Sequence, residues 1–165
     1  MNILERVRQF EEADKPIDAL EAYDEIFNQG IAEWEDYINA AVLLFLCQDY
    51  GYSSEHRLPK SIIDQAWYRS NEILDEAEKN FGPIDEITFW RRYFEFAVLG
   101  EPSFEDECKY LVNKGMTLVP CLHILSSTSD IKYLPHCRKL LNRVNDGKTA
   151  KDRYVKSILE NIPGL

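Results

Sequence analysis

The chain has 165 residues, a net charge of −10 at pH 7, 45% hydrophobic residues and 29% charged residues. This length fits one domain, and the apolar fraction is too high for a disordered chain. No apolar run approaches the roughly 18–20 residues that cross a bilayer, and the four cysteines do not form a disulfide framework. We therefore expect a single domain over residues 1–165, in the reducing cytoplasm and without a membrane.

The charge is distributed unevenly along the chain. Residues 1–55 contain 13 acidic and 3 basic side chains, whereas residues 108–165 contain 4 acidic and 10 basic ones. A negative field of this kind repels phosphate backbones and attracts basic surfaces. The charge pattern therefore predicts no nucleic-acid partner and favours a protein partner with a basic surface, although acidic residues more commonly serve only to keep a surface solvated.

Hydrophobic periodicity predicts α-helices nearly everywhere, because apolar residues recur at spacings of three and four. In chain order the predicted helices cover about 3–10, 16–27, 33–48, 61–81, 85–99, 103–114, 118–126, 135–145 and 149–159. Ser61 with Asp64, and Ser103 with Asp106, have the spacing of capping boxes at two helix starts. About nine helices joined by short turns predict an all-α fold, with basic C-terminal helices over residues 118–161.

The second and third predicted helices carry small and aromatic residues in a regular order. The positions are Ala19, Tyr23 and Ile26, followed by Tyr37, Ala40, Ala41 and Leu44. This order resembles the tetratricopeptide repeat, best over residues 13–44, in which small residues let helix backbones approach and aromatic residues fill the space between helix pairs. The resemblance implies an antiparallel array of helix hairpins, an α-solenoid, and a peptide-binding adaptor or chaperone. A compact helical bundle is the alternative fold.

Residues 49–60 interrupt the helical pattern with a polar stretch rich in turn-forming residues. We interpret this stretch as an insertion loop within the second repeat. Tyr50, Tyr52 and Arg57 belong to residue types that often anchor interfaces, so the loop is a candidate binding element. A tolerated surface loop is the alternative interpretation.

Seven acidic residues form the second candidate binding surface. They are Asp14, Asp18, Glu21, Glu25, Glu33, Glu35 and Asp36. The first four are spaced by four, three and four residues, which places them on one side of the second predicted helix, and the others add charge at the start of the third. Such a stripe can receive the lysines and arginines of a partner, or it can be the solvated face of an amphipathic helix.

The common sequence motifs of catalysis are absent. The chain contains no H-E-x-x-H, no G-x-S-x-G and no dinucleotide-binding fingerprint. The most metal-like residues are Cys121, His123, His136 and Cys137, because sulfur and imidazole ligands suit zinc. Their spacing is unusual for a zinc site, and packed cysteines with surface histidines are the alternative. The sequence therefore predicts no cofactor, no metal and no enzymatic activity, with a small zinc-containing enzyme as an alternative.

These features together favour a non-enzymatic protein-binding module. Its most concrete form is a small acidic inhibitor or immunity protein. Such a protein would neutralise a basic toxin, such as a nuclease, by placing its acidic surface over the cationic cleft of the toxin. The peptide-binding adaptor is the alternative that the repeat resemblance implies.

Overall fold

The computed structural model covers residues 1–165 and is entirely helical, which confirms the all-α prediction. Ten α-helices and one short 3-10 helix follow one another along the chain. They are α1 (Ile3–Glu12), α2 (Pro16–Asn28), α3 (Trp34–Cys47), α4 (Tyr50–Glu55), α5 (Lys60–Phe81), α6 (Asp85–Leu99), α7 (Glu105–Asn113), α8 (Cys121–Ser127), η1 (Ile131–Tyr133), α9 (Leu134–Val144) and α10 (Ala150–Glu160). None of these helices combines the length and the apolar composition that crossing a bilayer requires.

The additional helix lies in residues 49–60, so the prediction of a loop is wrong for this segment. The Asp49 side chain accepts a hydrogen bond from the Tyr52 backbone N–H at 2.9 Å and thereby caps α4. After α4 the backbone passes through Arg57, which has a φ of +50°, and the next side chain, Leu58, is buried. The segment is therefore a short helix anchored by an apolar side chain.

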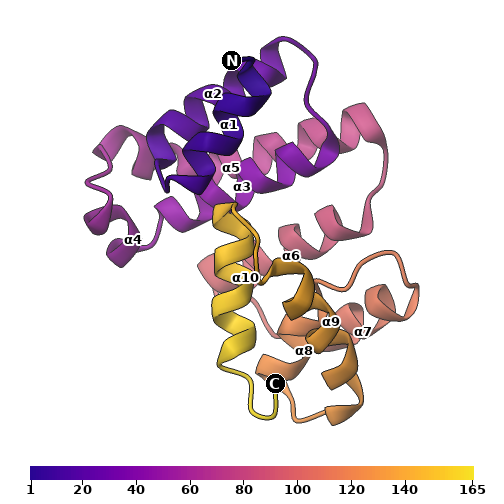
Figure 1. Cartoon of the computed structure of the whole chain (residues 1–165). Helices are drawn as coiled ribbons and strands as arrows, with labels where there is room; N and C mark the ends of the chain where they lie inside the picture. The colour runs from indigo at the N-terminus through magenta and orange to yellow at the C-terminus, as the bar shows by residue number, and fades with distance from the viewer. The chain divides into compact units, whose positions relative to one another are not determined.

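The helices divide into two compact units, whereas the sequence predicted one domain. The N-terminal unit contains residues 1–82 together with 148–151, and the C-terminal unit contains residues 83–147 together with 152–165. In Figure 1 the first unit comprises α1 to α5, and the second comprises α6 to α9 with most of α10. The chain first passes from one unit to the other at the turn between α5 and α6.

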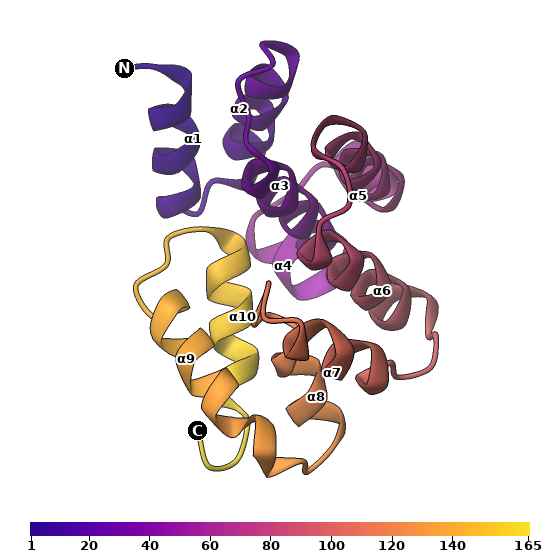
Figure 2. The ribbon, with the colours of Figure 1, turned by 90° about the vertical axis from the view of Figure 1, so that its right-hand side faces the viewer.

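The N-terminal unit is built around α3, which lies between α2 and α5 (Figure 2). Every side chain from Ala40 to Leu44 on α3 is buried. Ala19 on α2, Ala40 on α3 and Ala66 on α5 are at most 1% exposed. Because the distance between packed helices depends on the side chains at their contact, these alanines let the three helices approach closely.

A buried carboxylate connects three segments of the N-terminal unit. Glu11 on α1 is 3% exposed and accepts hydrogen bonds from the Tyr23 hydroxyl at 2.7 Å and from the Ala150 backbone N–H at 2.9 Å. Ala150 begins α10, so the carboxylate satisfies one of the N–H groups that a helix start leaves without a partner inside the helix. The neighbouring Glu12 is exposed and forms an ion pair with Lys148 at 2.8 Å. These contacts hold residues 148–151 in the N-terminal unit.

The C-terminal unit has an aromatic core centred on α6. Phe89, Trp90 and Phe94 on this helix are fully buried. The hydroxyl groups of Tyr93 on α6 and Tyr154 on α10 lie 2.7 Å apart and are hydrogen-bonded. Burial of one large apolar side chain stabilises a fold by about 1.5–3 kcal/mol, so Phe89, Trp90 and Phe94 each contribute about that amount to the unit.

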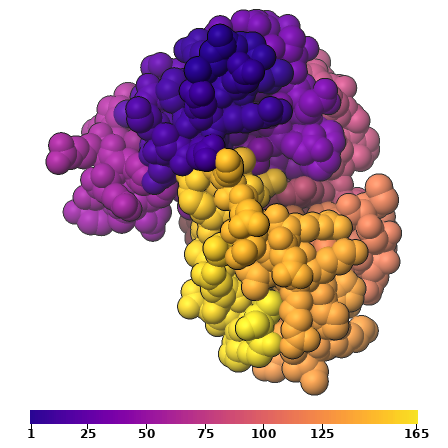
Figure 3. Space-filling view, in the orientation of Figure 1, coloured from indigo at the N-terminus to yellow at the C-terminus, as the bar shows by residue number.

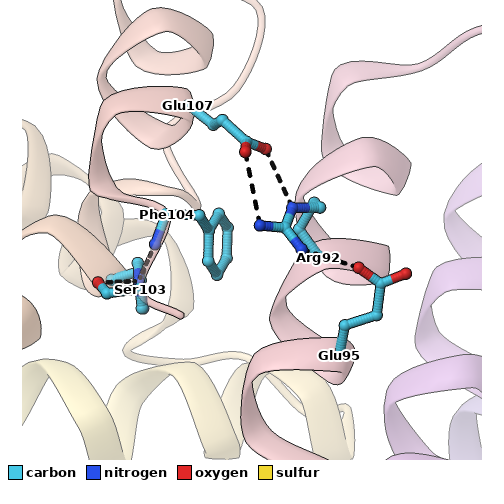
Figure 4. Close-up of polar contacts among 6 residues, drawn as sticks. Arg92, Glu95, Ser103, Phe104 and Glu107 are labelled. Atoms are coloured by element: carbon cyan, nitrogen blue, oxygen red, sulfur yellow. Dashed lines mark hydrogen bonds and ion pairs between the residues drawn. The ribbon is translucent and has the colours of Figure 1, made fainter. Parts of the chain in front are cut away.

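An arginine joins α6 to α7 beside this core (Figure 4). The Arg92 guanidinium lies 5.1 Å from the centre of the Phe104 ring, and its Nε donates a hydrogen bond to Glu107 at 3.1 Å. A terminal nitrogen of the same side chain donates to Glu95 at 2.9 Å. The hydrogen bonds with Glu95 and Glu107 raise the pKa of Arg92.

Candidate functional site

The acidic residues predicted along the second helix have two different roles. Asp18 and Glu21 are exposed on α2 and make no hydrogen bond or ion pair. Asp14 instead lies in the turn before α2, where its Oδ2 is 2.8 Å from Nε2 of His56. Glu25 forms an ion pair with Arg6 of α1 at 3.4 Å. The prediction of one continuous open stripe is therefore wrong, because two of its four carboxylates are bound by basic groups of this chain.

The contact between Asp14 and His56 connects the α1–α2 turn to α4. His56 also bonds through Nδ1 to the carbonyl oxygen of Tyr52 at 2.9 Å. Partial burial opposes the charge of His56, but the hydrogen bonds to Asp14 and to Tyr52 outweigh it and raise the pKa of His56. When both ring nitrogens donate, the imidazolium neutralises Asp14, so this carboxylate contributes little to the acidic surface.

The acidic residues at the start of α3 also differ from one another. The Glu33 backbone N–H donates to Oδ2 of Asp36 at 2.9 Å, which satisfies a donor at the start of the helix. Burial raises the pKa of the half-buried Asp36. Glu35 is exposed and has no hydrogen bond or ion pair. Glu35 is thus available to a partner, whereas the Asp36 carboxylate caps the start of α3.

The free carboxylates belong to the strongly acidic part of the molecule. The N-terminal unit contains 18 aspartates and glutamates and 9 lysines and arginines, a net charge of −9. The C-terminal unit contains 11 acidic and 10 basic residues, so it is almost neutral. The predicted basic region over residues 118–161 therefore does not make its unit strongly basic. We call Asp18, Glu21 and Glu35 the free acidic set.

The aromatic and basic residues predicted on the loop lie on α4 and at its end. In Figure 3 the segment around α4 forms the left-hand edge of the N-terminal unit. Tyr50 is 85% exposed, and Arg57 is exposed as well. Tyr52 is half-buried, with its ring 4.1 Å from that of His56. Tyr50 and Arg57 can reach a partner, whereas Tyr52 is part of the local structure.

The four candidate zinc ligands do not converge. The Sγ atoms of Cys121 on α8 and Cys137 on α9 lie 2.8 Å apart in the core as free thiols. The hydrogen bond with Cys137, together with burial, raises the pKa of Cys121 and keeps it protonated. His136 lies beside the Tyr133 ring, with ring centres 5.5 Å apart, whereas the His123 ring stacks on Phe104. No group of three or more histidine, cysteine or acidic side chains in this chain is arranged to hold a metal ion.

His123 belongs to the core of the C-terminal unit, so its interpretation as a surface histidine is wrong. It is 1% exposed, and its ring stacks on Phe104 with 4.2 Å between ring centres. Its Nε2 accepts a hydrogen bond from the Phe104 backbone N–H at 3.3 Å. Burial lowers the pKa of His123, which favours the neutral ring that this hydrogen bond requires.

Ser103 lies beside His123, a contact that the sequence reasoning missed. The Ser103 Oγ is 3.0 Å from His123 Nε2, which is the distance of a nucleophile and its base. The same hydroxyl donates to Glu105 at 2.6 Å, and it lowers the pKa of that carboxyl. The hydrogen bonds of His123 all involve Nε2, so no third group orients the ring through Nδ1. We interpret the pair as a structural link between the α6–α7 turn and α8.

A groove on the N-terminal unit is the other feature that sequence reasoning missed. It runs between α2 and α5 over α3 and has a volume of about 490 Å³. Its apolar wall residues include Ile17 and Leu20 on α2 and Ile62 and Tyr68 on α5. Tyr68 is 66% exposed. The exposure of Tyr68 could have been predicted from the sequence, because helical spacing separates Tyr68 from the buried stripe of α5.

Carboxylates line both rims of this groove. Glu21 and Asp24 belong to the α2 rim, and Glu72 belongs to the α5 rim. Arg69 of α5 is the only basic residue in the lining, and it donates to Asp24 at 2.9 Å and lies 3.6 Å from Glu72. Glu21, one of the free acidic set, remains unpaired. The groove thus combines an apolar wall with an excess of negative charge.

Comparison with known protein families, with characterised proteins and with solved structures gives no match for this chain. The surface of the N-terminal unit carries the features that bear on function. Its two accessible features are the free acidic set and the apolar groove with acidic rims.

Proposed function

We propose that this chain is a non-enzymatic protein-binding module whose N-terminal unit binds a basic protein surface. The observation that supports the proposal is the free acidic set, Asp18, Glu21 and Glu35, on a unit with a net charge of −9. Carboxylates without internal partners keep their full attraction for an incoming cation. Carboxylates already paired with lysine, arginine or histidine of the same chain have lost most of it.

The most concrete form of this function is an inhibitor or immunity protein that neutralises a basic toxin, such as a nuclease. A cationic cleft that binds a phosphate backbone would be steered onto the acidic surface and blocked there. Electrostatic steering raises the association rate and weakens as salt is added, because ions screen charges separated by more than about 8–10 Å. Rapid, salt-sensitive association is therefore the expected behaviour.

Two further features belong to this proposal. A tetratricopeptide-like array of helix hairpins would present α1 to α5 as a rigid surface, and the buried Ala19, Ala40 and Ala66 suit such an array. A reducing cytoplasm suits the four cysteines, which are all buried free thiols.

The test compares two charge-reversed proteins with the parent. The first carries Asp18→Lys, Glu21→Lys and Glu35→Lys. The matched control carries Glu101→Lys, Asp106→Lys and Asp146→Lys, which change the charge equally on exposed, unpaired residues of the C-terminal unit. Each immobilised protein is exposed to a lysate of the source cells, and the retained proteins are eluted with a salt gradient and identified by mass spectrometry.

We expect the parent and the control to retain the same basic protein and to release it as salt rises, while the first variant retains none. Equal retention by all three proteins, or retention only of partners without net positive charge, would contradict the proposed function. Binding kinetics of the purified pair then provide the second measurement. The first variant should have a lower association rate, and the parent should lose most of its rate advantage at high salt.

A further inference from the structure

We propose that the groove between α2 and α5 is a docking site for an amphipathic α-helix that carries lysine or arginine beside its apolar face. The inference rests on the proposed function, because it names the part of the basic partner that the N-terminal unit would hold. The apolar face of the guest helix enters the groove, and its basic side chains lie along the acidic rims.

The apolar contribution comes from four accessible side chains on facing helices. Ile17 and Leu20 of α2 and Ile62 of α5 are half-buried, and Tyr68 of α5 is 66% exposed. Single apolar residues on a surface are ordinary, but a group that shares one groove marks an interaction site. Tyrosine offers a large contact area with few rotatable bonds, which makes Tyr68 the expected anchor.

The dimensions of the groove suit a helix of about three turns. On α5 its lining extends from Ser61 to Ile73. Twelve steps of about 1.5 Å give a length of about 18 Å, which matches about twelve residues of a guest helix. A guest of this length presents apolar side chains at positions i, i+3, i+4 and i+7, the spacing with which helices bind in grooves.

The charge of the rims selects a basic guest. The lining contains three carboxylates and one arginine, so its net charge is −2, and this excess would repel an acidic helix. Arg69 shows how a cation fits there, because its guanidinium bridges from α5 to Asp24 on α2 and also lies close to Glu72. A guest lysine beside Glu21 would meet a carboxylate that has no partner in this chain. A neutral small molecule would leave these charged rims unused.

Three synthetic helical peptides test the proposal against the full chain. Each has about 14 residues, and the first carries leucine at the four apolar positions with lysine on both flanks. The second replaces every lysine with glutamate, and the third replaces every leucine with serine. Fluorescence anisotropy of the labelled peptides measures binding. We expect the leucine–lysine peptide to bind at least about tenfold more tightly than either of the others.

Substitutions in the chain locate the binding site. We expect Tyr68→Ala and Leu20→Ser each to weaken binding of the leucine–lysine peptide by about tenfold. Tyr50→Ala removes another exposed tyrosine, on α4 of the same unit, and should change binding less than about twofold. Glu21→Lys on the rim should weaken binding more than Glu35→Lys, which lies outside the groove lining. Circular dichroism confirms that each variant is folded.

Several results would contradict the proposal that the groove is a docking site. These are equal binding of the leucine and serine peptides, no binding of the leucine–lysine peptide, or unchanged binding after Tyr68→Ala and Leu20→Ser. Loss of binding in Tyr50→Ala alone would place the site at α4 and would also overturn it. Failure of the proposed function is a separate result, because that function predicts loss of the captured basic protein after charge reversal of the free acidic set. In a further outcome, charge reversal abolishes capture while Tyr68→Ala and Leu20→Ser do not affect it. That result would support the proposed function and exclude the groove as the binding site.

Discussion

Replacement of Glu11 by alanine should destabilise the N-terminal unit far more than replacement of its neighbour. The Glu11 carboxylate is 3% exposed and accepts hydrogen bonds of 2.7 Å from Tyr23 and 2.9 Å from Ala150. A hydrogen bond to a charged group contributes about 1.5–3 kcal/mol, and Glu11→Ala removes two of them. The substitution also removes the cost of burying a charge, which offsets part of this loss. We therefore expect Glu11→Ala to lower the free energy of unfolding by about 2–4 kcal/mol.

Glu12→Ala is the matched control, because Glu12 is exposed and loses only the ion pair with Lys148. Such a pair contributes less than about 1 kcal/mol. Urea unfolding followed by tryptophan fluorescence reports on both units, because Trp34 and Trp67 lie in the N-terminal unit and Trp90 lies in the core of the C-terminal unit. If Glu11→Ala costs no more than Glu12→Ala, the buried carboxylate does not stabilise this unit.

A double-mutant cycle with Tyr23→Phe isolates one of the two hydrogen bonds of Glu11. Tyr23→Phe removes only the hydroxyl that donates to the carboxylate. The combined effect of the two substitutions should be smaller than the sum of the single effects by about 1–2 kcal/mol. Additive effects would show that the hydroxyl and the carboxylate do not interact in solution.

Three further substitutions test other contacts. Gly147→Ala would bring the new Cβ into collision with the Asp152 side chain, so we expect a loss of about 1–3 kcal/mol by calorimetry, and unchanged stability would rule out this close approach. His56→Gln should destabilise the protein mainly at acid pH. The raised pKa of His56 stabilises the fold fully below its unfolded pKa of about 6.5, and this contribution is lost as the pH rises through the folded-state pKa. A stability difference from the parent that stays constant between about pH 5.5 and 8.5 would refute the role of the pair with Asp14. Arg92→Lys keeps the charge but loses the fork-shaped contact, so urea unfolding should show a loss of under about 1.5 kcal/mol that shrinks in 1 M salt; a loss independent of salt would argue against an ionic contact.

The sequence predicted the helices well because their signals are local. Pro16 begins α2 as expected, and Gly100 ends α6 in the left-handed conformation, with a φ of +70°. The apolar periodicity of nine helices was also visible. Each of these features depends only on residues within one or two turns of the same helix.

The predicted helix caps were wrong where proline or a tertiary contact intervened. Ser61 does not cap α5, because the helix begins one residue earlier, at Lys60 after Pro59. Ser103 does not cap α7, because its hydroxyl donates to Glu105 and lies beside His123 of α8. The first error is local, whereas the second depends on a residue twenty positions away that no spacing rule reveals.

The candidate surface was predicted in part, for the same reason. Helical spacing placed Asp18 and Glu21 on the solvent-facing side of α2, where they lie. It could not show that Asp14 binds His56, 42 residues later, or that Glu25 binds Arg6. The groove was missed because its walls come from two helices that are brought together only by packing on α3.

The placement of residues 148–151 affects how the protein is made. The Glu11 carboxylate and the Ala150 N–H are 139 positions apart. Ribosomes add about 5–20 residues per second, so about 7–28 s separate the synthesis of these two groups. Until almost the whole chain has been translated, the Glu11 carboxylate therefore lacks one of its hydrogen-bond donors. Translation speed and early chaperone contact are thus expected to affect the yield of folded protein.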